Sequence, residues 1–302
     1  MLIDTHAHLN FKAYKDDLDE VIKRTLAENI RVVNVGTKYE TSKKAVEIAE
    51  KYEGMYASIG MHPIHIKTDL FKIKTDEEEG AFQPFGEEFD KARYKDLVLR
   101  SRSDEGKNKI VAIGEIGLDY YLPSQILRSK TWEGEPKTNT KLGQFKEKQK
   151  EVFIKQLELA QELRLPVILH CRMAHEDIIT TLQQYNNTTL RGVVHCFTGT
   201  IEEAEKYLEM GFYLGFNGII FKLNLDEVIK KIPLERILIE TDCPYLTPPL
   251  SSQIFQGKTW EDKRNEPIFI KYVVQKIAEL KNLNFQEVAD ITAKNAQNLF
   301  GI

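Results

Sequence analysis

Cysteine is scarce in this sequence, and its three cysteines show no disulfide or metal-binding pattern. Their number is odd, and no two of them are spaced as CxxC. This usage suits a reducing compartment better than a disulfide-stabilised secreted domain. The chain also has no apolar run close to the length of a membrane-spanning helix. No basic stretch followed by an apolar one opens the sequence, so we expect no signal peptide and predict a cytoplasmic location, with a nuclear one as the alternative.

An excess of basic residues is also missing. Lys and Arg number 42 against 46 Asp and Glu, which gives a formal net charge of −4. Non-specific binding of nucleic acids usually depends on a strongly basic surface, so the charge gives no support for that class of protein. It does not exclude the class, because metal cations within a site can hold a phosphate locally.

Short apolar, β-branched segments alternate with longer segments of helical periodicity. The predicted strands are Leu2–Thr5, Arg31–Val35, Met55–Ile59, Ile110–Gly114, Pro166–His170, Gly192–Cys196, Phe212–Phe216 and Arg236–Glu240. The predicted helices are Leu18–Glu28, Thr41–Tyr52, Phe145–Leu163, His175–Tyr185, Ile201–Met210, Leu225–Ile232, Pro267–Leu280 and Phe285–Phe300. Alternation of this kind indicates parallel βαβ units. Eight strands favour a (β/α)8 TIM-like barrel of the α/β class, with an open doubly wound sheet as the alternative.

Two stretches interrupt this pattern and are predicted to be loop insertions in a single domain of residues 1–302. Lys67–Asn108 contains an acidic run, and Leu122–Gly143 has little apolar periodicity. Both follow strand ends on the expected catalytic face, where they could border a substrate. For most of their residues, however, the simpler interpretation is a solvated loop.

Residue types that can bind metal ions occur at the ends of five predicted strands. His6 and His8 are two residues apart and share a face, although such a pair alone is a weak indication. The other candidates, each at the end of an apolar strand, are Glu115, His170, His195 and Asp242. Barrel enzymes place their active sites at the carboxyl ends of the strands. Core packing explains this coincidence poorly, so we predict that all six residues bind metal.

The number of candidate ligands indicates more than one ion. Four histidines and two carboxylates exceed the needs of a single tetrahedral zinc with an open position. They suit two divalent ions, the usual equipment for hydrolysis of phosphate esters. We assign His6, His8 and Asp242 to one ion and His170 and His195 to the other, and Glu115 lies between them. Such mixed ligands accept Mg²⁺, Mn²⁺ or Zn²⁺.

Four further residues are candidates for binding a phosphate group. His62 and His65 follow the third predicted strand in GMHPIHIK, although His65 is equally consistent with an ordinary loop histidine. Arg172 lies two residues beyond His170 on the same face and could make a bidentate phosphate contact. Arg264 precedes a predicted helix, and its alternative role is in the N-terminal region of that helix.

The motifs resemble those of the TatD-like metal-dependent deoxyribonucleases of the amidohydrolase superfamily. In order they are IDTHAHL, GMHP, AIGEIGLDY, LPVILHCR, GVVHCFTG, IETDCPYL and RNEP. The resemblance implies a TIM-like barrel, divalent metals on the same six residues, and phosphate contacts from His62, His65 and Arg172. It also implies 3′–5′ exonucleolytic hydrolysis of DNA. The segment between Leu246 and Arg264 is longer than in bacterial members, which leaves the strand preference open.

We therefore predict a monomeric nuclease that acts on DNA, through exposed ends and without a membrane partner. Two ions would acidify a water that attacks the phosphodiester, with Asp242 accepting its proton and Glu115 holding both ions. One alternative is an amidohydrolase acting on a small-molecule amide or ester, or on an aminoacyl ester of tRNA. Many such relatives bridge their metals with a carboxylated Lys, and Glu115 in that place favours the nuclease. A non-catalytic binding protein is disfavoured by the complete set of ligands.

Overall fold

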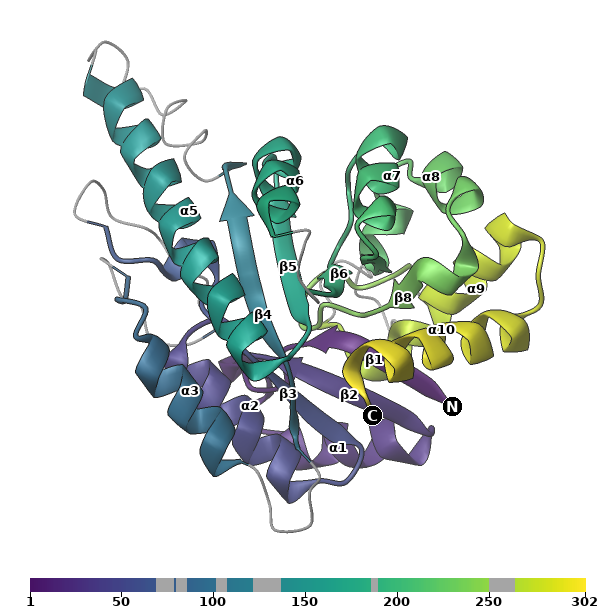
Figure 1. Ribbon diagram of the computed structural model, residues 1–302. Helices are drawn as coiled ribbons and strands as arrows, with labels where there is room; N and C mark the ends of the chain where they lie inside the picture. Colours follow the sequence, from purple (N-terminus) through teal and green to yellow (C-terminus); the bar gives the residue numbers. More distant parts are fainter. Residues whose placement is uncertain (69–78, 80–85, 102–107, 122–136, 186–189, 250–263) are drawn as a thin grey trace.

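The computed structural model describes residues 1–68, 79, 86–101, 108–121, 137–185, 190–249 and 264–302. Within these residues eight strands form one parallel sheet in the order of the sequence. They are β1 (Leu2–Ala7), β2 (Ile30–Val35), β3 (Met55–Ile59), β4 (Ile110–Asp119), β5 (Val167–Arg172), β6 (Gly192–Val194), β7 (Tyr213–Phe216) and β8 (Ile237–Ile239). The sheet curves into a nearly closed barrel with helices around it, so the predicted (β/α)8 fold is confirmed (Figure 1).

Helices connect the strands and cover the outside of the sheet (Figure 1). They are α1 (Leu18–Ala27), α2 (Tyr39–Lys51), α3 (Lys91–Arg100), α5 (Lys137–Leu163), α6 (His175–Gln184), α7 (Ile201–Glu209), α8 (Asp226–Lys231), α9 (Ile270–Lys281) and α10 (Phe285–Phe300). Short 3-10 helices are η1 (Lys12–Tyr14), η2 (Pro63–His65), η3 (Gly218–Phe221), η4 (Leu234–Arg236) and η7 (Pro267–Phe269). No helix in the described ranges is long and apolar enough to cross a membrane.

Backbone and side-chain hydrogen bonds join β1 to β8 and to the residues that follow it, which brings the edges of the sheet together. The Thr5 hydroxyl donates to the carbonyl of Ile239 at 3.0 Å. Beyond β8, the amide of Asp242 donates to the carbonyl of His6, and the amide of His8 donates to that of Cys243, both at 2.8 Å. This closure places the end of β1 beside the segment that follows β8.

Asp4 strengthens the same closure. Its carboxyl group accepts from the Thr241 amide at 2.9 Å and contacts the Thr241 hydroxyl at 2.6 Å. It also accepts from the backbone amide of His6 at 3.3 Å. Burial raises the pKa of Asp4 to about 8 despite these bonds. Asp4 therefore links the two edges of the barrel.

The predicted insertions contain two helical parts that the sequence pattern did not indicate. Helix α3 lies inside Lys67–Asn108 and is the crossover between β3 and β4. Its charges hide its periodicity, but Asp90 caps its first turn and it buries Tyr94 and Val98. The last residues of Leu122–Gly143 belong to α5, which begins at Lys137. The rest of both stretches lies largely outside the described residues, as does most of the segment between Leu246 and Arg264.

Gly117 of β4 allows a close approach that any side chain would block. Its φ is +143°, and a Cβ atom would lie 2.0 Å from the carbonyl oxygen of His170 on β5. We expect Gly117→Ala to lower the free energy of unfolding by at least about 2 kcal/mol, because the strands must separate or the backbone must strain.

Gly143→Ala is the matched control. Beyond the backbone of its own helix, no atom of the described residues lies within 4 Å of the added methyl in α5, so helix propensity should stabilise the protein by up to about 1 kcal/mol. Urea denaturation of both variants measures this, and equal effects would contradict the steric argument.

Candidate metal centre

The structure brings all six candidate ligands together at the carboxyl ends of the strands. His6 lies in β1 and His8 just beyond it, and His170 lies in β5. The remaining three follow or lie within other strands: His195 follows β6, Asp242 follows β8, and Glu115 lies inside β4. Glu115 does not end its strand as expected, because β4 continues to Asp119.

One group of side chains surrounds the ring nitrogens of His6 and His8. Their Nε2 atoms are 3.1 Å apart. Asp242 Oδ1 lies 3.7 Å from His6 Nε2 and 3.4 Å from His8 Nε2. Glu115 Oε2 lies 3.4 Å and 3.8 Å from the same two atoms. Four potential donor atoms from β1, β4 and the segment after β8 therefore face one point.

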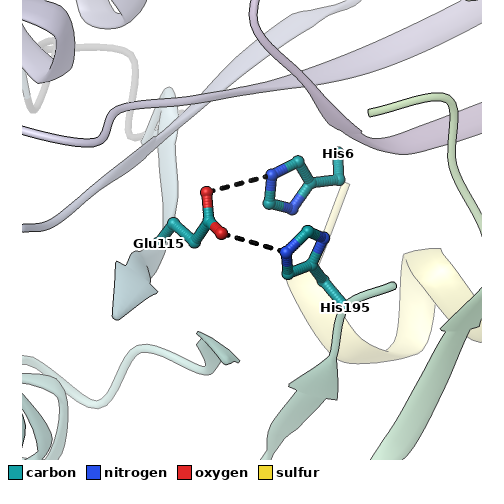
Figure 2. Close-up of side chains that lie close together, drawn as sticks. All are labelled: His6, Glu115 and His195. Atoms are coloured by element: carbon teal, nitrogen blue, oxygen red, sulfur yellow. Dashed lines mark ion pairs between the residues drawn. The ribbon is translucent and has the colours of Figure 1, made fainter. Parts of the chain in front are cut away.

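A second group surrounds the other oxygen of Glu115. Oε1 lies 2.7 Å from His170 Nδ1 and 2.9 Å from His195 Nε2. Figure 2 shows the carboxylate between His6 and His195, with one oxygen directed at each ring. The rings of His6 and His195 are stacked with centroids 3.9 Å apart. Glu115 thus joins the two groups through its two oxygens.

The spacing of the first group fits a cation. Two atoms that bind one ion tetrahedrally at about 2.0–2.2 Å lie about 3.3–3.6 Å apart. The two histidine nitrogens lie 3.1 Å from each other and 3.4 to 3.8 Å from the oxygens of Asp242 and Glu115. The tautomer of His8 fits as well. Its Nδ1 lies 2.9 Å from the carbonyl oxygen of Val35, which can only accept, so Nδ1 carries the proton and Nε2 presents its lone pair.

The charges at the centre suit metal binding too. Burial acts to raise the pKa of Glu115, but its interactions with His62 and His195 and the hydrogen bonds of His170 and His195 hold it well below its ordinary value. Burial also opposes the charged form of His195, yet the carboxylates of Glu115 and Glu240 raise its pKa well above the usual range. Glu115 is therefore ionised beside a histidine that holds a proton. A bound cation can take the place of that proton and pair with the carboxylate.

His62 lies beside the second group but has the opposite tautomer. Its Nδ1 accepts the backbone N–H of Ile64 at 3.1 Å, so the proton of the neutral ring is on Nε2. That Nε2 lies 3.4 Å from Glu115 Oε1. Burial and the neighbouring His170 lower the pKa of His62 to about 4, which keeps the ring neutral. His62 therefore directs an N–H donor into the centre, whereas a ligand must present a lone pair.

The other three candidates for phosphate binding lie in different surroundings. The ring of His65 is buried with Nε2 2.8 Å from Glu79 Oε2. The Arg172 guanidinium is exposed and stacks over the ring of Tyr121 at 3.8 Å. Arg264 makes a bidentate pair with Asp17, at 2.8 and 2.6 Å, and donates to the carbonyl of Ala13. The phosphate-binding roles of these three residues remain predictions, and the contacts that Arg264 makes are with other residues of the protein.

Two buried carboxylates that are not among the candidates from the sequence contact the histidines of the second group. Asp119 Oδ2 lies 3.3 Å from His170 Nε2. Glu240 Oε1 lies 3.4 Å from His195 Nδ1. For Asp119 the spacing offered a signal, since it lies four residues after Glu115 in β4 and even spacing keeps strand residues on one face. Glu240 follows β8, where this rule does not apply.

Comparison with known proteins identifies the family of this chain. The family model described as TatD related DNase matches residues 3–301. The chain is 42% identical to YabD of Bacillus subtilis, an uncharacterized metal-dependent hydrolase, with all of both chains covered. It is 30% identical to the 3′-5′ ssDNA/RNA exonuclease TatD of Escherichia fergusonii, covering all of this chain and 99% of that one. The crystal structure of the TatD homologue YjjV from Escherichia coli has a TM-score of 0.73 at 26% identity, and the match covers 100% of this chain and 98% of YjjV. The chain therefore belongs to the TatD-related DNase family and is a metal-dependent hydrolase.

Proposed function

We propose that this hydrolase is a deoxyribonuclease that shortens DNA from its 3′ end with two divalent ions in its centre. The observation that carries the proposal is Glu115, whose two oxygens face two separate groups of histidine and carboxylate atoms. A shared carboxylate between two sets of ligands is the arrangement expected of a two-ion site for phosphate esters. In this proposal His6, His8 and Asp242 bind one ion, and His170 and His195 bind the other.

Asp242 is the proposed proton acceptor. Bound divalent ions would lower the pKa of a water to roughly 7 and offset the charge of the phosphate. Burial opposes ionisation of Asp242, but the hydrogen bond of His8 and the charges of His195 and His6 lower its pKa, so it is ionised and able to accept a proton. Its carboxylate lies at the edge of the centre, where its side chain is 14% exposed and reachable by water.

Substrate phosphate would be held by donors at the rim of the same centre. The Nε2–H of His62 points into the second group, and the neutral ring can donate to a phosphate oxygen without adding a charge. Arg172 extends from the end of β5 and could form a bidentate contact. The name of the Escherichia fergusonii relative supports action on a single-stranded end and includes RNA as a substrate of that protein.

End-labelled DNA tests the proposal. We expect the metal-stripped protein to leave 5′-labelled single-stranded DNA intact, and added Mg²⁺, Mn²⁺ or Zn²⁺ to restore a ladder that shortens from the 3′ end. Blocking the 3′ end should suppress the ladder, and EDTA should stop the reaction again.

Other outcomes separate the alternatives. Cleavage of internal bonds in circular DNA would replace the exonuclease by an endonuclease. Intact DNA under every metal, together with hydrolysis of small-molecule esters or of aminoacyl-tRNA, would favour the second candidate activity. The monomeric state and the cytoplasmic location stay predictions, which sedimentation and fractionation can test.

A further inference from the structure

We infer that Asp119 and Glu240 are positioning residues that hold His170 and His195 in opposite tautomers, so that each ring presents a different nitrogen to the metal centre. This inference rests on the ligand roles proposed above for the two histidines. A ring nitrogen that binds a cation must offer its lone pair, so the proton of the neutral ring must lie on the other nitrogen. A carboxylate beside that other nitrogen can keep the proton there.

His170 faces the centre with Nδ1, which lies 2.7 Å from Glu115 Oε1. Its Nε2 points the other way and meets Asp119 Oδ2 at 3.3 Å. The Asp119 carboxylate is itself held, because Oδ1 accepts the backbone N–H of Tyr121 at 2.9 Å. Gln149 fixes the backbone of Asp119 by bonding to both its amide and its carbonyl, each at 3.0 Å. Asp119 therefore stabilises the tautomer with the proton on Nε2.

The ring of His195 has the opposite orientation to that of His170. Its Nε2 lies 2.9 Å from Glu115 Oε1, and its Nδ1 lies 3.4 Å from Glu240 Oε1. Glu240 is completely buried, and the same Oε1 accepts the amide of Cys196 at 2.7 Å and the side-chain amide of Asn217 at 3.0 Å. Asn217 is oriented for this by the Ile219 N–H, which donates to its Oδ1. His195 Nδ1 makes no hydrogen bond within the described residues, and the lone pairs of Glu240 Oε1 beside it at 3.4 Å favour the tautomer with the proton on Nδ1.

Gly215 of β7 supports the position of Glu240. A Cβ atom at this glycine would lie 2.5 Å from Glu240 Oε2 and 3.0 Å from its carboxyl carbon. That oxygen has no hydrogen-bond partner among the described residues. A buried oxygen without a partner costs free energy, so packing and hydrogen bonding alone do not account for a carboxylate here. The other oxygen of Glu240, which lies beside His195 Nδ1, accounts for a carboxylate at this position.

The two carboxylates allow a matched test with amide substitutions. In Asp119→Asn the amide oxygen must stay beside the Tyr121 N–H, which can only donate, so the NH₂ group faces His170 Nε2. This arrangement favours the wrong tautomer of His170. In Glu240→Gln the oxygen stays beside the Cys196 and Asn217 donors, and it is this same oxygen that faces His195 Nδ1. The tautomer of His195 should therefore survive. Both substitutions remove one negative charge from a buried site.

The experiment measures zinc affinity by competition with a chelating dye and ring protonation by long-range ¹H–¹⁵N spectra. Only seven histidines contribute signals. In the zinc-loaded wild type we expect the ring proton of His170 on Nε2 and that of His195 on Nδ1. Asp119→Asn should weaken zinc binding about 10–100-fold and displace the His170 proton. Glu240→Gln should keep the His195 pattern and weaken binding by under about tenfold, whereas Glu240→Ala should lose both.

Equal weakening by both amide variants, with wild-type ring patterns, would mean that the carboxylates act through charge alone and would overturn the inference. Wild-type zinc affinity in Asp119→Asn would overturn it as well, as would the absence of zinc shifts on both rings in the wild type. Thermal unfolding checks that each variant is folded. None of these readings uses a nucleic acid, so the expected result supports the inference even if the protein fails to cleave DNA.

Discussion

Replacing Glu115 by glutamine should reduce the metal content below two equivalents and lower the rate of hydrolysis at least about 10³-fold, while leaving the barrel folded. The substitution keeps the shape of the side chain but puts an NH₂ group in place of one oxygen, and each oxygen faces a different group of candidate ligands. An amide nitrogen cannot bind a cation, so at least one group loses its shared ligand. The loss of several kcal/mol of charge stabilisation corresponds to a rate at least about 10³-fold lower.

Metal analysis by mass spectrometry and single-turnover cleavage of labelled DNA measure this effect. Glu203→Gln is a suitable control, because Glu203 lies in the capping box of α7, where the oxygen of a glutamine can still accept the N–H of Thr200. A Glu115→Gln protein that retains two equivalents of metal would contradict the bridging role. One that retains metal and near-normal cleavage would contradict the whole site.

Asp242→Asn is expected to slow hydrolysis about 10²–10⁴-fold, the usual contribution of a general base. Asparagine suits the position, because Asp242 has a φ of +55° and Asn tolerates this left-handed conformation whereas Ala does not. The backbone should therefore stay in place, and the change isolates the loss of the proton acceptor. The His6 and His8 nitrogens and Glu115 remain to hold an ion.

Steady-state kinetics at saturating Mn²⁺ separate the two roles of Asp242. A proton acceptor predicts a fall in kcat with little change in KM, whereas a ligand alone predicts activity that returns at higher metal concentration. Full recovery with excess metal would therefore remove Asp242 as the base. Asp177→Asn is the control, since that carboxylate on α6 bonds to Tyr120 and Lys150, outside the groups of candidate ligands.

The convergence of the candidate ligands could be predicted from the sequence because it depends on a rule of the fold. Parallel strands end at one edge, so His170 and His195 at the ends of neighbouring apolar segments had to lie close together. The strand β4 was harder, because its glycines end the apolar pattern at Gly114 while hydrogen bonding to β5 continues to Asp119. Asp119 therefore lay beyond the expected strand.

The atoms that a polar side chain contacts could not be read from the sequence. The tautomers of His8 and His62 follow from a carbonyl of β2 and an amide of η2, and no residue type indicates either. Arg264 shows the same difficulty, because an arginine near a helix start fits a phosphate contact as well as the pair that it makes with Asp17. Which partner an arginine chooses depends on packing between the first and last parts of the chain.

The closure between β1 and the residues after β8 has a consequence for the order of events during synthesis. Thr5 and Ile239 are separated by 234 positions, and Asp4 and Thr241 by 237. Contacts across such distances form late, because the intervening chain must first be ordered. A nascent chain that still lacks β8 has His6 and His8 but no Asp242, and therefore has no complete first group. Hydrolysis would therefore begin only in the finished barrel.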